Sequence, residues 1–150
     1  MIYTTKKINF EKILPIWRKL WPVGKIYPIS SMLYLGGYDV SIQNKFTPSY
    51  FALCCDKEII GVISGHKSNQ EQYRLRGLYI ESEYRNRFLS KKLFECIDKQ
   101  ARKENCNFIW SLPRKQAIKA YKSAGFAQST KFFSTQDVSW YENCYVFKNI

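Results

Sequence analysis

The chain has 150 residues, which is enough for one hydrophobic core and too few for two, so we expect a single domain over residues 1–150. Hydrophobic residues make up 45% of the sequence and it contains no repeat or low-complexity tract, which excludes a largely disordered chain. The net charge of +12 indicates an anionic partner but does not choose among nucleic acid, an anionic membrane and a phosphorylated cofactor.

The sequence lacks the features of a secreted or membrane protein and those of a metal site. The N-terminus has no apolar signal core and no stretch approaches a membrane-spanning length, so we expect a cytoplasmic protein without a membrane partner. The five cysteines form no CxxC pair and there is one histidine, so we expect free thiols and no metal site.

The first half of the chain predicts one long helix and three strands. Apolar residues from Phe10 to Trp21 recur at helical spacing after Asn9, a possible cap. A short helix is predicted over Ser31–Leu35, ended by the glycines that follow. Residues 50–55 and 59–64 predict a hairpin, and residues 74–80 predict a third strand.

The second half predicts a parallel crossover. Leu89, Leu93, Ile97 and Ala101 step by four within a helix over 88–102, and 107–112 is a short apolar strand. A helix over 114–124 ends at Gly125, and strands over 126–133 and 141–147 flank a polar loop, 134–139. We therefore expect an α/β fold of mixed α+β type, with a mixed sheet of about seven strands and helices on both faces.

A basic turn precedes the helix that begins near Phe88. A helix N-terminus presents unpaired backbone N–H groups and a partial positive charge, so it can bind a phosphate. Arg85, Asn86 and Arg87 come just before this point, and the Ser90 hydroxyl could donate one more hydrogen bond. The turn predicts an anion site, although a purely structural role fits such a turn equally well.

Three motifs stand out together: the turn Arg85-Asn86-Arg87-Phe88-Leu89-Ser90, the block from Ala117 to Phe126, and the strand segment Leu78-Tyr79-Ile80. Together they resemble the GNAT superfamily of acyl-CoA-dependent N-acyltransferases. The turn aligns with the pyrophosphate loop, Arg/Gln-x-x-Gly-x-Gly/Ala, with Phe88 at the first glycine and Ser90 at the second small residue. Ala117, Tyr121 and Gly125-Phe126 match the signature A-x-x-x-Y-x-x-x-G-F. Leu78-Tyr79-Ile80 resembles the strand that pairs with the pantetheine arm. The resemblance implies a GNAT-like fold with acetyl-CoA as cofactor.

The resemblance also implies roles for individual residues. An amine attacks the acetyl thioester directly, a backbone N–H at Leu78 or Tyr79 stabilises the carbonyl oxygen, and Tyr121 protonates the departing thiolate. Arg114 stands where the family often has an asparagine that touches the cofactor. The implied cofactor-binding set is Leu78, Tyr79, Ile80, Arg85, Asn86, Arg87, Phe88, Leu89, Ser90 and Arg114.

The general base is not assigned by these motifs. His66 follows the second hairpin strand and is a candidate, although a lone histidine is more often a surface or hydrogen-bonded residue. Glu71 lies in a predicted loop and could act through water. We expect Glu81 and Glu83 to pair with the neighbouring Arg85 and Arg87 instead of removing protons.

Several functions remain open at this point. The first is an N-acetyltransferase that acts on a primary amine of a small molecule or peptide, for which an edge strand is compatible with a homodimer. The second is a nucleic-acid-binding module, which is less favoured because the aromatic residues are not interleaved with basic ones; acetylation of an aminoacyl-tRNA would combine the two. The third is a non-catalytic interaction protein that lost activity through Phe88. In the second, the phosphate contacts would be Arg74, Arg76, Arg114 and Lys115.

Overall fold

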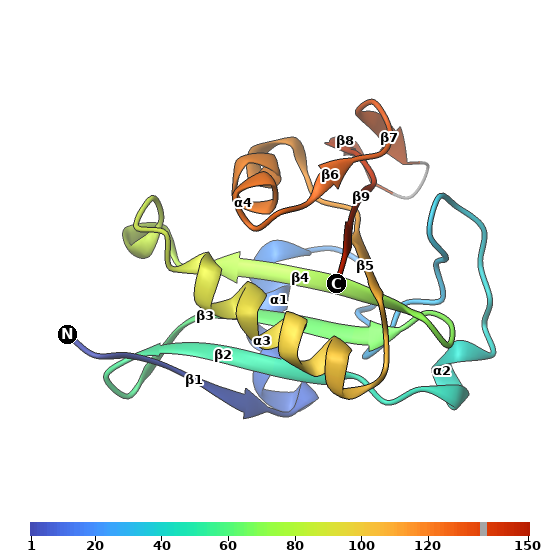
Figure 1. The fold of residues 1–150 in the computed structure, drawn as a ribbon. Helices are drawn as coiled ribbons and strands as arrows, with labels where there is room; N and C mark the ends of the chain where they lie inside the picture. The colour runs from blue at the N-terminus through green and yellow to red at the C-terminus, as the bar shows by residue number, and fades with distance from the viewer. Residues whose placement is uncertain (136–137) are drawn as a thin grey trace.

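A computed structural model describes residues 1–135 and 138–150 and the side chains outside 135–141 (Figure 1). Its main sheet has seven strands in the order β1-β2-β3-β4-β5-β9-β6, and β7 and β8 form a separate two-stranded sheet. The strands are β1 Tyr3–Ile8, β2 Ser49–Cys55, β3 Glu58–Lys67, β4 Gln72–Ile80, β5 Phe108–Ser111, β6 Ala127–Gln128, β7 Phe133–Thr135, β8 Val138–Asn143 and β9 Val146–Asn149.

Helices cover both faces of the main sheet, as the sequence predicted (Figure 1). The helix α3, Ser90–Lys103, buries Leu93, Ile97 and Ala101 against one face. The helix α1, Phe10–Leu20, buries Ile13 and Trp17 against the other, and the Asn9 side chain caps it by accepting a hydrogen bond from the Lys12 N–H at 3.0 Å. The remaining helices are α2 Ile42–Lys45 and α4 Ile118–Ser123, with 3-10 turns at Ser82–Tyr84 and Lys115–Ala117.

Strand pairing confirms the hairpin and the parallel crossover. The strands β2, β3 and β4 are antiparallel neighbours, and β4 pairs with β5 in parallel, with α3 as the connection between them. Successive side chains of a strand point to opposite faces. Accordingly, Tyr73 and Leu75 of β4 join the core beneath α3, whereas Arg76 lies over the rings of Trp17 and Trp21 on the α1 side.

Three local predictions differ from the structure. The strand β1 was not predicted, because its polar sequence forms an exposed edge without an apolar alternation. Ser31–Leu35 is not a helix: Leu35, Gly36 and Gly37 all have positive φ, and they reverse the chain so that Met32 bridges Tyr38. The helix predicted over 114–124 begins as a 3-10 turn.

The C-terminal strand predictions were too long. Of 126–133, only Ala127–Gln128 and the first residue of β7 are strand, and the prediction over 141–147 covers parts of β8 and β9. The predicted polar loop at 134–139 includes residues 136–137, which lie outside the described residues. Within the described ranges, no helix combines the length and apolar character needed to cross a bilayer.

Candidate active site

The principal pocket opens where β4 and β5 separate. These strands pair only from Gln72–Arg74 to Phe108–Trp110. Beyond that point a cavity of about 640 Å³ lies between Gly77–Ile80 on one side and Ser111–Pro113 on the other. Its two ends are formed by the turn before α3 and by the start of α4. Diverging carboxyl ends of parallel strands are the usual ligand site of α/β sheets.

A bulge at Gly77 shapes the β4 wall of this pocket. Val62 pairs with Tyr79 while Ser64 pairs with Arg76, so β4 contains one extra residue. Gly77 has φ +69°, and a Cβ there would lie 2.2 Å from Nε1 of Trp17, which donates a hydrogen bond to the Gly77 carbonyl at 2.9 Å. Only glycine fits this position, because both the left-handed backbone and the contact with Trp17 exclude a side chain.

The outer end of the pocket is the N-terminus of α3. This helix has no side-chain cap at Leu89, so its first turn is open to an anion. Asn86 and Phe88 have φ of 61° and 59°, the left-handed conformation that glycine adopts most easily. The Phe88 side chain is 87% exposed, so its ring lies in solvent.

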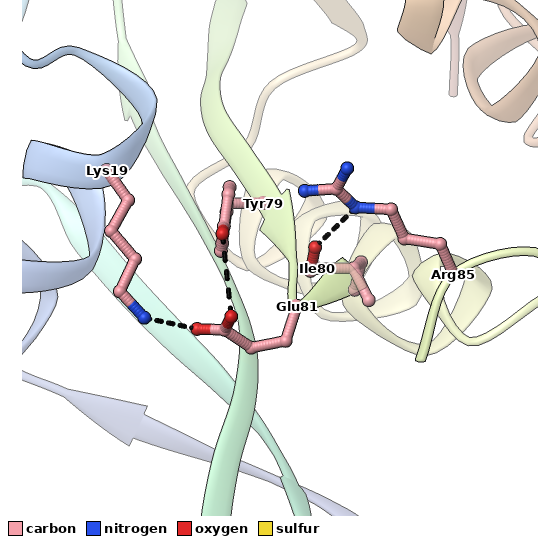
Figure 2. A network of polar contacts seen from close by, with 5 residues as sticks. All are labelled: Lys19, Tyr79, Ile80, Glu81 and Arg85. Carbon is pink, nitrogen blue, oxygen red and sulfur yellow. Dashed lines mark hydrogen bonds and ion pairs between the residues drawn. The ribbon is translucent and has the colours of Figure 1, made fainter. Parts of the chain in front are cut away.

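At this outer end of the pocket, the guanidinium that lines the wall belongs to Arg85. Its Nε donates to the Ile80 carbonyl at 2.7 Å and its guanidinium lies over the Tyr79 ring, which fixes it against the end of β4 (Figure 2). Glu81 does not pair with Arg85, contrary to the sequence prediction. Its carboxylate forms an ion pair with Lys19 at 2.7 Å and accepts from the Tyr79 hydroxyl at 3.5 Å (Figure 2). The arginine therefore stays available at the pocket wall.

The inner end of the pocket contains a buried hydroxyl pair. The Tyr121 hydroxyl lies 3.2 Å from Oγ of Ser111, and Ser111 donates its own proton to the Leu75 carbonyl at 2.8 Å. Tyr121 must therefore be the donor between the two hydroxyls. Burial raises the pKa of Tyr121 to about 12, against smaller opposing effects of Ser111 and Arg74, so the phenol is protonated at neutral pH. Packing against Phe94 and Phe126 fixes its ring.

Most of the residues predicted from the sequence meet in this one pocket, and two do not. Arg87 lies over the Tyr84 ring and does not line the pocket. The residues that the structure brings together are Leu78, Tyr79, Ile80, Arg85, Asn86, Phe88, Leu89, Ser90, Arg114 and Tyr121.

His66 is the second residue outside the pocket. It is fully buried, its Nδ1 lies 3.0 Å from the Lys67 carbonyl, and its Nε2 accepts from the Ser30 N–H at 3.3 Å. Burial lowers the pKa of His66 to about 3, so the ring is neutral. With both nitrogens engaged by the backbone, it offers no free lone pair to a substrate, so its position gives no support to the sequence-based prediction that His66 is the base.

The pocket lining is cationic. Among the described residues that line it there is no Asp, Glu or His, whereas the cationic side chains include Lys19, Arg74, Arg76, Arg85 and Arg114. The less favoured nucleic-acid alternative used Arg74, Arg76 and Arg114 as phosphate contacts, but all three line this cavity. The remaining member of that set, Lys115, forms an ion pair with Glu142 at 3.5 Å. The structure does not assemble these four residues into an outward phosphate-binding face.

The comparisons with known proteins agree with this geometry. The sequence matches the Acetyltransferase (GNAT) family over residues 10–126. The fold is similar to that of Ard1 from Thermoplasma volcanium, with a TM-score of 0.71 and 15% identity over 100% of this chain and 99% of the other. No curated protein matches the sequence.

Two further solved structures share the fold. Arabidopsis thaliana NAA60 in complex with a bisubstrate analogue has a TM-score of 0.69 and 14% identity over 99% of this chain and 98% of its own. An aminoglycoside 6'-N-acetyltransferase complexed with coenzyme A has a TM-score of 0.69 and 12% identity over 99% and 97% of the two chains.

The protein has the fold of an acyltransferase, with the uncapped N-terminus of α3 at the entrance of a split sheet. The chain belongs to the GNAT acetyltransferase family. The cofactor of this family is acetyl-CoA, and the uncapped N-terminus of α3, the solvent-facing Phe88 ring and the acid-free lining are compatible with its phosphates.

Proposed function

We propose that the protein transfers an acetyl group from acetyl-CoA to a primary amine of a small molecule or peptide. The observation that carries this proposal is the continuity of one pocket from the N-terminus of α3 to the Tyr121 hydroxyl. A phosphate site and a protonated phenol at opposite ends of one cavity are what a phosphorylated thioester carrier requires. When bound, acetyl-CoA supplies a thioester whose carbon–sulfur bond breaks as a bond to the amine nitrogen forms, so that the sulfur gains a proton and the nitrogen loses one.

The chain's own groups divide this work along the pocket. The backbone of Leu89 and Ser90, with Arg85, would hold the diphosphate, and the open edge of β4 at Leu78–Ile80 would hold the extended arm. A backbone N–H of Leu78 or Tyr79 would stabilise charge on the carbonyl oxygen, because fixed donors act strongly in a site of low dielectric constant.

Tyr121 would supply the proton that the sulfur receives. Its hydroxyl holds a proton at neutral pH and lies at the inner end of the pocket, with Ser111 fixing its orientation. Ser111 is a positioning residue here: because its proton goes to the Leu75 carbonyl, its oxygen remains an acceptor for Tyr121. General acid catalysis of this kind contributes about 10²- to 10⁴-fold in rate.

No side chain of the described pocket lining is suited to remove a proton from the amine. The cationic lining instead disfavours an ammonium ion, because like charges at close range raise its free energy. We infer that the amine enters in its neutral form and loses its proton to solvent after attack.

Incubation with labelled acetyl-CoA and a panel of primary amines tests the proposal. We expect micromolar to millimolar binding of coenzyme A by calorimetry and transfer of label to at least one amine. A protein that binds no coenzyme A in this range would contradict the proposed function and would favour a fold relative without catalysis.

A further inference from the structure

Arg74 is a buried cation whose charge is not neutralised by the described residues around it. Its side chain is only 8% exposed and its guanidinium lies over the Trp110 ring, 4.5 Å from the centroid. Its Nε makes a long contact, 3.4 Å, with the Leu75 carbonyl. Among the described residues, Nη1 of Arg74 is buried and has no hydrogen-bond partner. An unsatisfied buried charge is costly to fold, so its presence needs a specific explanation, of which a bound anion is one.

Arg76 adds a second guanidinium on the same face of β4. Residues two apart on a strand point the same way and are separated by roughly 6.5 Å. The guanidinium of Arg76 lies 4.9 Å from the Trp17 ring centroid and 5.0 Å from that of Trp21, and it donates to the Tyr27 carbonyl at 2.8 Å. These contacts hold Arg76 in place, so the two arginines form a preorganised cationic pair in the wall of the pocket.

This pair is separate from the phosphate end of the pocket. Arg74 precedes Ile80 by six residues and Arg76 precedes it by four, which correspond to about 20 Å and about 13 Å along β4 at the usual rise per strand residue. Arg74 lies instead near Tyr121, whose hydroxyl is bonded to Ser111, and Ser111 and Nε of Arg74 both contact the Leu75 carbonyl. The anion that the pair is built to bind would therefore lie beside the reacting groups, where the acceptor amine must enter.

We propose that the acceptor amine carries an anionic group, a carboxylate or a phosphate, that is bound by Arg74 together with Arg76. This inference rests on the proposed acetyltransferase function and specifies its substrate class. The guanidinium of Arg74 offers an unsatisfied donor, and planar guanidinium groups bind carboxylate and phosphate oxygens with charge-assisted hydrogen bonds. The anion would also neutralise the charge of Arg74, whose Nη1 has no partner among the described residues.

Matched acceptor pairs provide the test. Acetyl transfer is measured for tyrosine against tyramine, tryptophan against tryptamine, lysine against cadaverine, and O-phosphoethanolamine against ethanolamine. We expect the anionic member of at least one pair to have a kcat/KM about 10- to 100-fold higher, the size of a charge-assisted hydrogen bond. A preference within the first three pairs identifies a carboxylate, and a preference confined to the last pair identifies a phosphate.

Substitutions of Arg74 test whether this residue causes the preference for the anionic amine. We expect Arg74→Gln to reduce transfer to the anionic amine by about 10- to 100-fold and to change transfer to the neutral amine by less than about threefold. Arg74→Lys keeps the positive charge but loses the planar guanidinium group. Its preference for the anionic amine should therefore lie between those of the wild type and Arg74→Gln. Lys119→Gln removes one exposed positive charge on α4 away from the pocket and should behave as wild type.

A binding measurement separates this inference from the activity. Calorimetry of the coenzyme A-loaded protein with N-acetyltyrosine and N-acetyltyramine should show tighter binding of the former, and Arg74→Gln should remove the difference. If coenzyme A binds and amines are acetylated with no preference for an anionic member, or if Arg74→Gln weakens both members equally, the anionic acceptor is refuted while the acetyltransferase function stands. If coenzyme A does not bind to the wild type, the proposed function itself fails.

Discussion

At the outer end of the pocket, the groups placed to bind an anion are backbone N–H groups and solvent-facing side chains, whereas at the inner end they are buried side chains. Phe88, Asn86 and Arg85 form the outer end beside the first turn of α3. Arg74 and Tyr121 form the inner end and are almost completely buried. We therefore expect the outer end to tolerate changes of side chain, because its donors belong to the main chain, and each inner side chain to carry a separate part of the proposed chemistry.

The largest expected effect is at the inner end, on turnover. We expect Tyr121→Phe to lower kcat by about 100-fold or more, because the proton for the leaving sulfur is lost, and to leave coenzyme A affinity nearly unchanged. Steady-state kinetics and calorimetry measure the two quantities. Ser111→Ala should give a smaller loss of kcat. A Tyr121→Phe protein with wild-type kcat would show that the phenol is a packing residue.

The pH dependence of kcat/KM tests the inference that the inner end of the pocket contains no general base. We expect kcat/KM to rise about tenfold per pH unit up to the solution pKa of the amine, because only the neutral amine attacks and Tyr121, with its pKa of about 12, stays protonated. Amines of different pKa should move the break in the profile accordingly. A break near pH 6 to 7 that is the same for every amine would reveal an enzyme base and contradict this account.

A substitution of Arg74 should have a smaller effect, and this effect is a gain in stability instead of a loss of activity. We expect Arg74→Met to raise the free energy of unfolding of the unliganded protein by about 1 kcal/mol, since a buried and unpaired charge is removed and this outweighs the lost contact with Trp110. Urea unfolding measures the difference. Arg76→Met is the matched control and should lose stability, because Arg76 gives up its hydrogen bond to Tyr27 and its stacking on two tryptophans. Clear destabilisation by Arg74→Met would mean that the protein itself compensates this charge.

The smallest effect is expected at the outer end. Phe88 already has the backbone conformation of a glycine, and its ring is in solvent. We therefore expect Phe88→Gly to change the Kd for coenzyme A by less than about threefold, with a stability gain below about 1 kcal/mol from relief of the left-handed backbone. Binding that tightens more than tenfold in Phe88→Gly would show that the ring does obstruct the phosphates.

The fold followed from the sequence wherever the periodicity was strong. Leu93, Ile97 and Ala101 are buried beneath α3 as predicted, and the hairpin and the parallel crossover are present. The strand β1 and the turn at Leu35–Gly37 could not be read in this way. The first is an edge strand with polar side chains, and the second depends on left-handed residues instead of on an apolar pattern.

The site was predictable only in part, for the same kind of reason. Short motifs placed Tyr121 and the turn before α3, but they contain no information about which side chains a sheet turns toward a cavity. Arg74 and Arg76 alternate with the buried Tyr73 and Leu75, and a central strand has no solvent face. Charged residues in a central strand were therefore the signal, present in the sequence, that the two arginines face a cavity. His66 gave no comparable signal, because its burial is set by contacts with Ser30 and Lys67 that only the folded chain brings together.

A crystal structure of the protein with coenzyme A is the sharpest test of the proposed site. We expect the diphosphate at the turn formed by residues 85–90 and the sulfur within hydrogen-bonding distance of the Tyr121 hydroxyl. Coenzyme A bound with its sulfur far from Tyr121, or with its diphosphate away from the N-terminus of α3, would contradict it.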